Sequence, residues 1–76
     1  MNKIRRKSLQ TIIDQLEDLK SGLEELQAVE EEYRDNMPEN LLGSERYEKA
    51  DEVVSNLEDA VSSLEEAISS IETAIE

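Results

Sequence analysis

Apolar side chains in the second half of the chain recur with alternating steps of three and four residues. The series runs without interruption through Tyr47, Ala50, Val54, Leu57, Val61, Leu64, Ile68, Ile71 and Ile75. Three near-identical heptads, 53–59, 60–66 and 67–73, make up most of it. This spacing aligns apolar residues along one face of an α-helix that packs against another helix. The pattern therefore predicts a long amphipathic helix.

The same heptads show that the apolar stripe is wider than a two-stranded coiled coil needs. Val54, Val61, Ile68 and Ile75 take position a, Leu57, Leu64 and Ile71 take position d, and Val53, Ala60, Ala67 and Ala74 take position g. A strict two-stranded coil needs only a and d. Apolar g positions indicate a helix with more than one neighbour.

The first half carries a similar but less regular series. It runs through Leu9, Ile12, Leu16, Leu19, Leu23 and Leu26, and then slips by way of Val29 to Tyr33. Glu30 occupies a position where a strict heptad has an apolar side chain. We expect a second amphipathic helix whose core face is interrupted near Glu30.

Turn signals separate the two series. Pro38 disfavours helical geometry at Met37, and Gly43 precedes Ser44, a favourable N-cap residue, with Glu45 suited to the positive end of the helix dipole. Leu41 or Leu42 is expected to cover the end of the core. The prediction is one all-α hairpin over 1–76, with helix one about 3–35, a loop about 36–43 and helix two about 44–75.

A simple register fits an antiparallel, coiled-coil-like hairpin. If paired residue numbers sum to 80, every layer is apolar on both sides: Leu9 with Ile71, Ile12 with Ile68, Leu16 with Leu64, Leu19 with Val61, Leu23 with Leu57, Leu26 with Val54, and Tyr33 with Tyr47. The same register brings the basic start, Lys3, Arg5, Arg6 and Lys7, beside Glu72 and Glu76.

The width of the stripe predicts self-association. One hairpin core leaves Ile13, the g-position alanines and Val29 exposed, and a chain of 76 residues without Cys or His has no disulfide or His/Cys metal site to stabilise it. We expect a homodimer in which two hairpins form a four-helix bundle. The residues expected to carry self-association are Ile13, Leu57, Val61, Leu64, Ile68 and Ile71.

The sequence offers no catalytic, cofactor-binding or metal-binding residue. It has no His base, no Cys nucleophile and no Gly-rich phosphate loop. Adjacent carboxylates such as Glu58 and Asp59 diverge by about 100° on a helix, and the Gly and alternating oxygen ligands of a calcium loop are missing. A non-enzymatic protein is the expectation.

The charge balance limits the partners. There are 20 acids against 8 bases, and four of the bases lie in the first seven residues. Such a surface repels nucleic-acid phosphates and anionic lipids and attracts basic proteins. The candidate acidic partner-binding face is Glu58, Asp59, Glu65, Glu66 and Glu72. A hairpin about 45 Å long would carry one net charge per about 3.8 Å, and a side-by-side dimer one per about 1.9 Å, close to the 1.7 Å of duplex DNA.

No apolar segment follows the basic start, and no run reaches the length of a membrane span. We therefore expect a cytoplasmic protein.

The loop and its flank also support a resemblance. The chain reads Asn-Met-Pro-Glu-Asn-Leu at 36–41, Gly-Ser-Glu at 43–45, Tyr-Glu at 47–48 and Leu-Glu-Glu-Ala-Ile at 64–68. These segments resemble a group of small acidic helical-hairpin proteins of phages and prophages of Gram-positive bacteria, which has no assigned activity. The resemblance implies a bacterial host as the setting and transfers no functional residue.

Two functional hypotheses follow. One is a self-associating helical protein-interaction module. The alternative is an acidic nucleic-acid mimic that inhibits a basic DNA- or RNA-binding defence protein of the host, of the anti-CRISPR or anti-restriction type.

Overall fold

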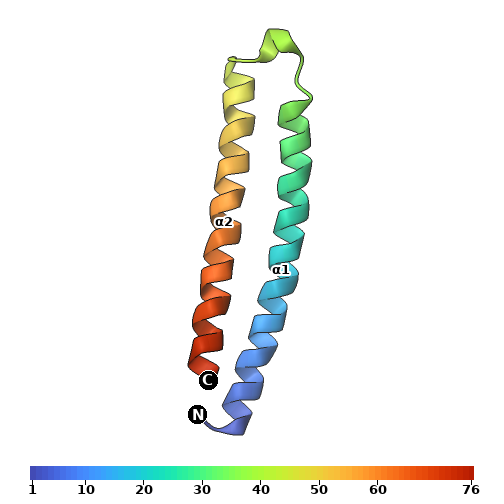
Figure 1. Ribbon diagram of the computed structural model, residues 1–76. Helices are drawn as coiled ribbons and strands as arrows, with labels where there is room; N and C mark the ends of the chain where they lie inside the picture. Colours follow the sequence, from blue (N-terminus) through green and yellow to red (C-terminus); the bar gives the residue numbers. More distant parts are fainter.

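The computed structural model describes all 76 residues and shows two antiparallel α-helices joined by a short loop (Figure 1). Helix α1 spans Lys3–Asp35 and helix α2 spans Glu45–Ile75, with a one-turn 3-10 helix, η1, at Glu39–Leu41 between them. There is no strand. The Cα atoms extend over 60 × 15 × 12 Å, so the molecule is a thin rod. The prediction of an all-α helical hairpin is confirmed.

Local chemistry fixes the helix ends. The Asn2 side chain caps α1 by accepting a hydrogen bond of 2.8 Å from the backbone N–H of Arg5. Ser44 caps α2, because its Oγ accepts from the N–H of Tyr47 at 3.3 Å and donates to the carbonyl of Leu41. Gly43 takes a backbone φ of +82°, which residues with a Cβ rarely adopt. Both helix boundaries at the loop lie within one residue of those expected.

Helix α2 presents the face that its heptads predict. Ala50, Val54 and Ile68 are buried, and the other members of the series are half-buried. In the loop, Leu41 is half-buried whereas Leu42 is 52% exposed, so Leu41 is the residue that lies near the end of the core.

Helix α1 is rotated relative to the expectation. Ile13 is only 2% exposed, whereas Leu19 and Leu26 are 62% and 59% exposed. Buried and half-buried residues of α1 follow alternating steps of four and three through Leu9, Ile13, Leu16, Lys20, Leu23, Gln27, Glu30 and Arg34. The predicted core assignment of Ile12, Leu19, Leu26 and Tyr33 is therefore wrong, and that of Leu9, Leu16 and Leu23 is right.

The register differs as well. Two ion pairs join the helices, Lys20 with Glu65 and Arg34 with Asp51, and in both the residue numbers sum to 85. The helices are thus shifted by about one turn from the predicted sum of 80. To within one residue, this register sets the core residues of α1 level with those of α2, for example Leu16 with Ile68 and Leu23 with Val61. The basic start does not form the expected contacts, since Lys3, Arg5, Arg6 and Lys7 take part in no ion pair.

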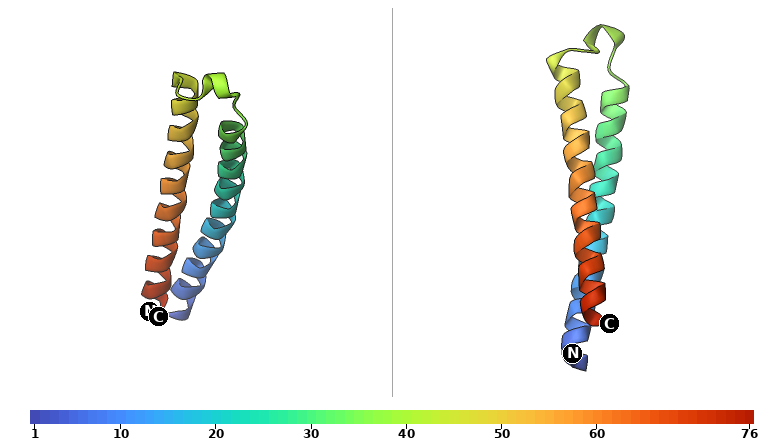
Figure 2. Two further views of the ribbon diagram at one scale, coloured as in Figure 1. Left: turned by 45° about the horizontal axis from the view of Figure 1, so that its top comes forward. Right: turned by 60° about the vertical axis from the view of Figure 1, so that its left-hand side comes forward.

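The two helices run side by side along their length, as Figures 1 and 2 show. In the half nearer the loop, the core positions of α1 carry the polar residues Gln27, Glu30 and Arg34. Helix α2 supplies Ala50 and Val54 there, which are only 4% and 2% exposed, so these polar side chains cover the apolar core face of α2. Neither helix is long and apolar enough to cross a membrane.

Candidate functional site

The observed rotation of α1 gives its residues new heptad positions. Position a holds Ile13, Lys20, Gln27 and Arg34; position d holds Leu9, Leu16, Leu23 and Glu30. Position g then holds Ile12, Leu19, Leu26 and Tyr33, and position e holds Gln10, Glu17, Glu24 and Glu31. In an antiparallel pair the g positions of both helices border the core on one side, and the e positions border it on the other. The hairpin therefore has two flanks of different chemistry.

We call the g side the apolar flank. It consists of Ile12, Leu19, Leu26 and Tyr33 of α1 together with Val53, Ala60, Ala67 and Ala74 of α2. The four side chains from α1 are large and remain 43% to 62% exposed. The c positions beside them continue the same surface: Gln15, Gly22 and Val29 on α1, and Asn56, Ser63 and Ser70 on α2. None of these residues is charged.

Both grooves of the molecule open beside this flank. The central one, about 510 Å³ in volume, is lined by Asp18, Leu19, Gly22, Leu23, Leu26 and Leu64. It reaches the core, because Leu23 and Leu64 are core residues of the two helices. The second groove, about 560 Å³, lies at the loop end, where the Arg46 Nε–H donates a hydrogen bond of 3.2 Å to the Tyr33 hydroxyl.

We call the e side the acidic flank. It consists of Glu17, Glu24 and Glu31 of α1 together with Asp51, Glu58, Glu65 and Glu72 of α2. Carboxylates thus border the core from both helices on this side, which would be repulsive without compensation.

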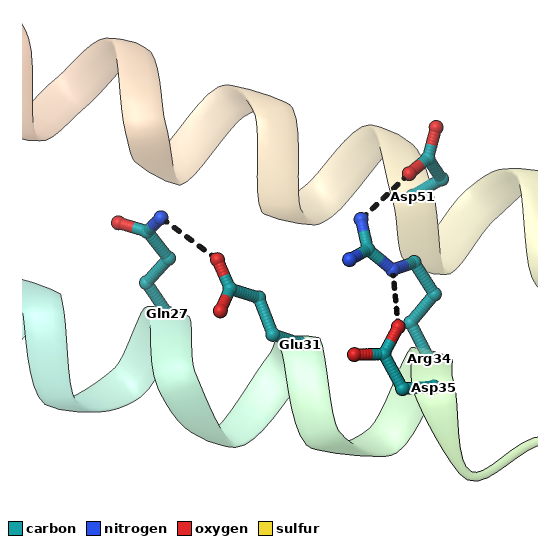
Figure 3. A network of polar contacts seen from close by, with 5 residues as sticks. All are labelled: Gln27, Glu31, Arg34, Asp35 and Asp51. Carbon is teal, nitrogen blue, oxygen red and sulfur yellow. Dashed lines mark hydrogen bonds and ion pairs between the residues drawn. The ribbon is translucent and has the colours of Figure 1, made fainter.

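Three polar side chains from position a of α1 supply that compensation. The Lys20 Nζ lies 3.7 Å from Glu65, the Gln27 amide donates to Glu31 at 3.1 Å, and Arg34 Nη1 lies 2.8 Å from Asp51. Figure 3 shows Gln27, Glu31 and Arg34 of α1 facing α2, where Asp51 meets the Arg34 guanidinium. Hydrogen bonds to Asp35 and then to Asp51 raise the pKa of Arg34 above its ordinary value. Lys20, Gln27 and Arg34 are spaced by seven residues; Lys20 and Arg34 bridge the two helices, whereas Gln27 binds Glu31 of its own helix.

The residues expected to carry self-association are mostly inside the hairpin. Ile13, expected to be exposed, is buried at 2%, because α1 turns it towards α2. Leu57, Val61, Leu64 and Ile71 are half-buried and Ile68 is 6% exposed, so α1 already covers them. Val29 is 59% exposed, as expected. Of the alanines expected to be exposed, Ala67 and Ala74 are exposed and Ala60 is half-buried.

Sequence reasoning missed the four large residues of the apolar flank as a surface. The sequence does contain a sign of this surface. Ile12, Leu19, Leu26 and Tyr33 repeat every seven residues, and so do Lys20, Gln27 and Arg34, so either set could face α2.

The acidic face has the exposure expected of it. Glu58, Asp59, Glu65, Glu66 and Glu72 are all exposed, and Glu65 alone among them forms an ion pair. The charge is more dilute than expected, since the Cα extent is 60 Å and the net charge of −12 gives about one charge per 5 Å. No three Asp or Glu side chains come together in a group that could hold a metal ion.

Comparison with known proteins finds no matching family model, no similar curated protein and no similar solved structure.

Proposed function

We propose that this chain is a non-enzymatic, self-associating helical interaction module, in the phage or prophage setting that its resemblance implies. The observation that carries the proposal is the apolar flank. Four large apolar side chains at heptad spacing, Ile12, Leu19, Leu26 and Tyr33, stay 43% to 62% exposed. A stripe that extends beyond positions a and d is typical of helices that pack against more than one neighbour.

The hairpin core alone is small, which supports the same proposal. Only 4 of 76 residues are buried. Fully burying a Leu or Ile side chain contributes about 1.5 to 3 kcal/mol, so covering four half-exposed ones adds several kcal/mol per copy. Such a contribution is large for a chain of this size, which has no disulfide to stabilise it.

Sedimentation equilibrium tests the proposal. We expect the purified protein to sediment as a dimer at micromolar concentration. Leu19→Glu with Leu26→Glu places two charges on the apolar flank and should convert it to a monomer that retains its helical circular dichroism. The control, Glu17→Gln with Glu24→Gln, changes the acidic flank of the same helix at the same spacing and should remain a dimer. A monomer mass for the unmodified protein across the micromolar range would refute the proposal.

A second candidate function is favoured by the exposure of Glu58, Asp59, Glu65, Glu66 and Glu72, which self-association through the apolar flank leaves uncovered. This is the acidic mimic that occupies the nucleic-acid groove of a basic host protein. Its charge density is a weakness, because one charge per about 5 Å falls well short of the one per about 1.7 Å of duplex DNA.

A further inference from the structure

We propose that a second copy of this chain covers the apolar flank about a twofold axis parallel to the helices, so that α1 of each copy packs on α2 of the other. This inference rests on the proposed self-association and specifies its geometry. All neighbouring helices in the resulting four-helix bundle would be antiparallel, as in up-and-down bundles.

The two halves of the apolar flank differ in size, and this difference selects the arrangement. The flank residues of α1 are large, and those of α2 are small. The observed register sets each large residue level with a small one: Ile12 with Ala74, Leu19 with Ala67, Leu26 with Ala60, and Tyr33 with Val53. The flank is therefore a ridge of large side chains beside a trough of small ones.

Two twofold arrangements can bring such flanks together. An axis parallel to the helices keeps every residue at its own level and lays each ridge in the trough of the other copy, so Leu19 meets Ala67 and Leu26 meets Ala60. An axis across the helices instead sets ridge on ridge and trough on trough. Helix separation depends on the side chains at the contact. The second arrangement would therefore force one pair of helices apart while the other closes, whereas the first gives equal spacing and complementary packing.

Charge distribution also identifies a second copy as the occupant. The flank holds no charged residue at its g and c positions from Ile12 to Tyr33 on α1 or from Val53 to Ala74 on α2, in a chain with net charge −12. A basic partner would find carboxylates only at the edge of this surface, where Asp18 and Glu32 line the two grooves. Two acidic copies can approach through this surface, because the acidic flanks point away from the contact and repulsion is kept at a distance.

The size of the flank is sufficient for a stable dimer. Helix α2 has 31 residues. At 1.5 Å per residue and about 10 Å per helix, two packed helices offer a face of about 46 by 20 Å, or roughly 900 Å² per copy. Specific interfaces bury about 800 Å² per partner. The contact would also close the central groove and bury Leu23 and Leu64 more fully, which joins the two hairpin cores into one.

Cross-linking between differently labelled chains tests the arrangement, because the protein has no native Cys. Gln15→Cys and Ser70→Cys sit at c positions at the same level on α1 and α2. Chains carrying one or the other are mixed, annealed and treated with a short thiol cross-linker. We expect the mixed pair to react roughly 100-fold faster than free chains at about 10 μM, because thiols held together reach millimolar effective concentrations.

Two further mixtures make the result decisive. Gln15→Cys with Val29→Cys would cross-link only if α1 packed on α1 of the other copy. Gln10→Cys with Glu72→Cys lies on the acidic flank and serves as the matched control, with no cross-link expected. The arrangement is overturned if the dimer cross-links Gln15→Cys with Val29→Cys, if it cross-links only the control pair, or if Gln15→Cys and Ser70→Cys stay unlinked. Each of these outcomes leaves self-association intact. A monomer in sedimentation overturns both.

Discussion

Ile12 and Ile13 are chemically identical neighbours with opposite surroundings. Ile13 is 2% exposed in the core of the hairpin, while Ile12 is 43% exposed on the apolar flank. One residue along a helix turns a side chain by about 100°, so a stripe as wide as that of α1 can bury either residue. The two therefore serve different contacts: Ile13 holds the hairpin together, and Ile12 is available to a second copy.

Ile13→Ala should lower the free energy of unfolding by about 2 to 5 kcal/mol, because it removes three methyl or methylene groups from a buried site and leaves a cavity. The control is Ile4→Ala, the same substitution on the same helix at a residue that is 79% exposed, which should change stability by less than about 0.5 kcal/mol. Urea unfolding followed by circular dichroism, at one fixed protein concentration, measures both. Equal losses at the two positions would contradict the burial of Ile13.

The two helices differ in how completely their sequences determine their orientation. Helix α2 contains one apolar series with polar residues on both sides apart from small g residues, so its core face was predicted correctly. The loop was predictable because Pro38, Gly43 and Ser44 act on the backbone locally. These features need no knowledge of the partner helix.

Helix α1 contains two series with alternating steps of three and four residues, which share Leu9, Leu16 and Leu23; one is apolar and the other includes polar residues. One continues through Ile12, Leu19 and Leu26, and the other through Ile13, Lys20 and Gln27. Counting apolar residues favours the first, and the sum of 80 followed from it. The structure selects the second, because Lys20, Gln27 and Arg34 reach past the core to carboxylates on the acidic flank. Such pairing depends on side-chain reach and on both helices together, which a pattern of apolar spacing does not contain.

The polar residues at position a should therefore specify the rotation of α1. We expect the triple substitution Lys20→Leu, Gln27→Leu and Arg34→Leu to raise the urea midpoint of unfolding, because apolar side chains pack in the core without desolvating a charge. It should also make the two faces of α1 nearly equivalent in apolar character, so that either can pack against α2. NMR spectra of the backbone amides should then show more than one set of signals.

The matched control shifts the change by one residue, to Ser21→Leu and Ala28→Leu on the exposed side of α1, and should keep a single set of signals. A triple variant with one set of signals and an unchanged apolar flank would show that the polar residues do not set the orientation.

At the scale of the whole molecule, the hairpin separates two kinds of surface. The apolar flank and the acidic flank border the same core on opposite sides, so a contact on one leaves the other free. A dimer formed through the apolar flanks would carry an acidic flank on each outer side and would double the net charge of the rod. It would then have about one charge per 2.5 Å over its 60 Å length, nearer to duplex DNA than a single hairpin is. The two proposed functions are therefore compatible in one assembly.

Neutralising the candidate acidic partner-binding face distinguishes the two proposed functions, self-association and nucleic-acid mimicry. Replacing Glu58, Glu65, Glu66 and Glu72 by Gln and Asp59 by Asn changes the net charge from −12 to −7 without touching the apolar flank. Helicity should be retained, and dimerisation should be unchanged or stronger, because repulsion between acidic copies decreases. The dimer dissociation constant from sedimentation and the helical signal from circular dichroism measure these effects. Weaker dimerisation would mean that these carboxylates take part in the contact between copies.

Binding to a basic host protein is the second readout of the same variant. A mimic should lose that binding, its affinity should fall steeply with added salt, and DNA should compete with it. The control neutralises five exposed acids outside the acidic flank, Asp14, Asp18, Glu25, Glu32 and Glu39, so that net charge changes equally at another place. If both variants lose binding alike, the overall charge of the rod attracts the partner and no particular face is recognised. If binding survives both variants and half-molar salt, mimicry is excluded, and the partner must be held by apolar contacts instead.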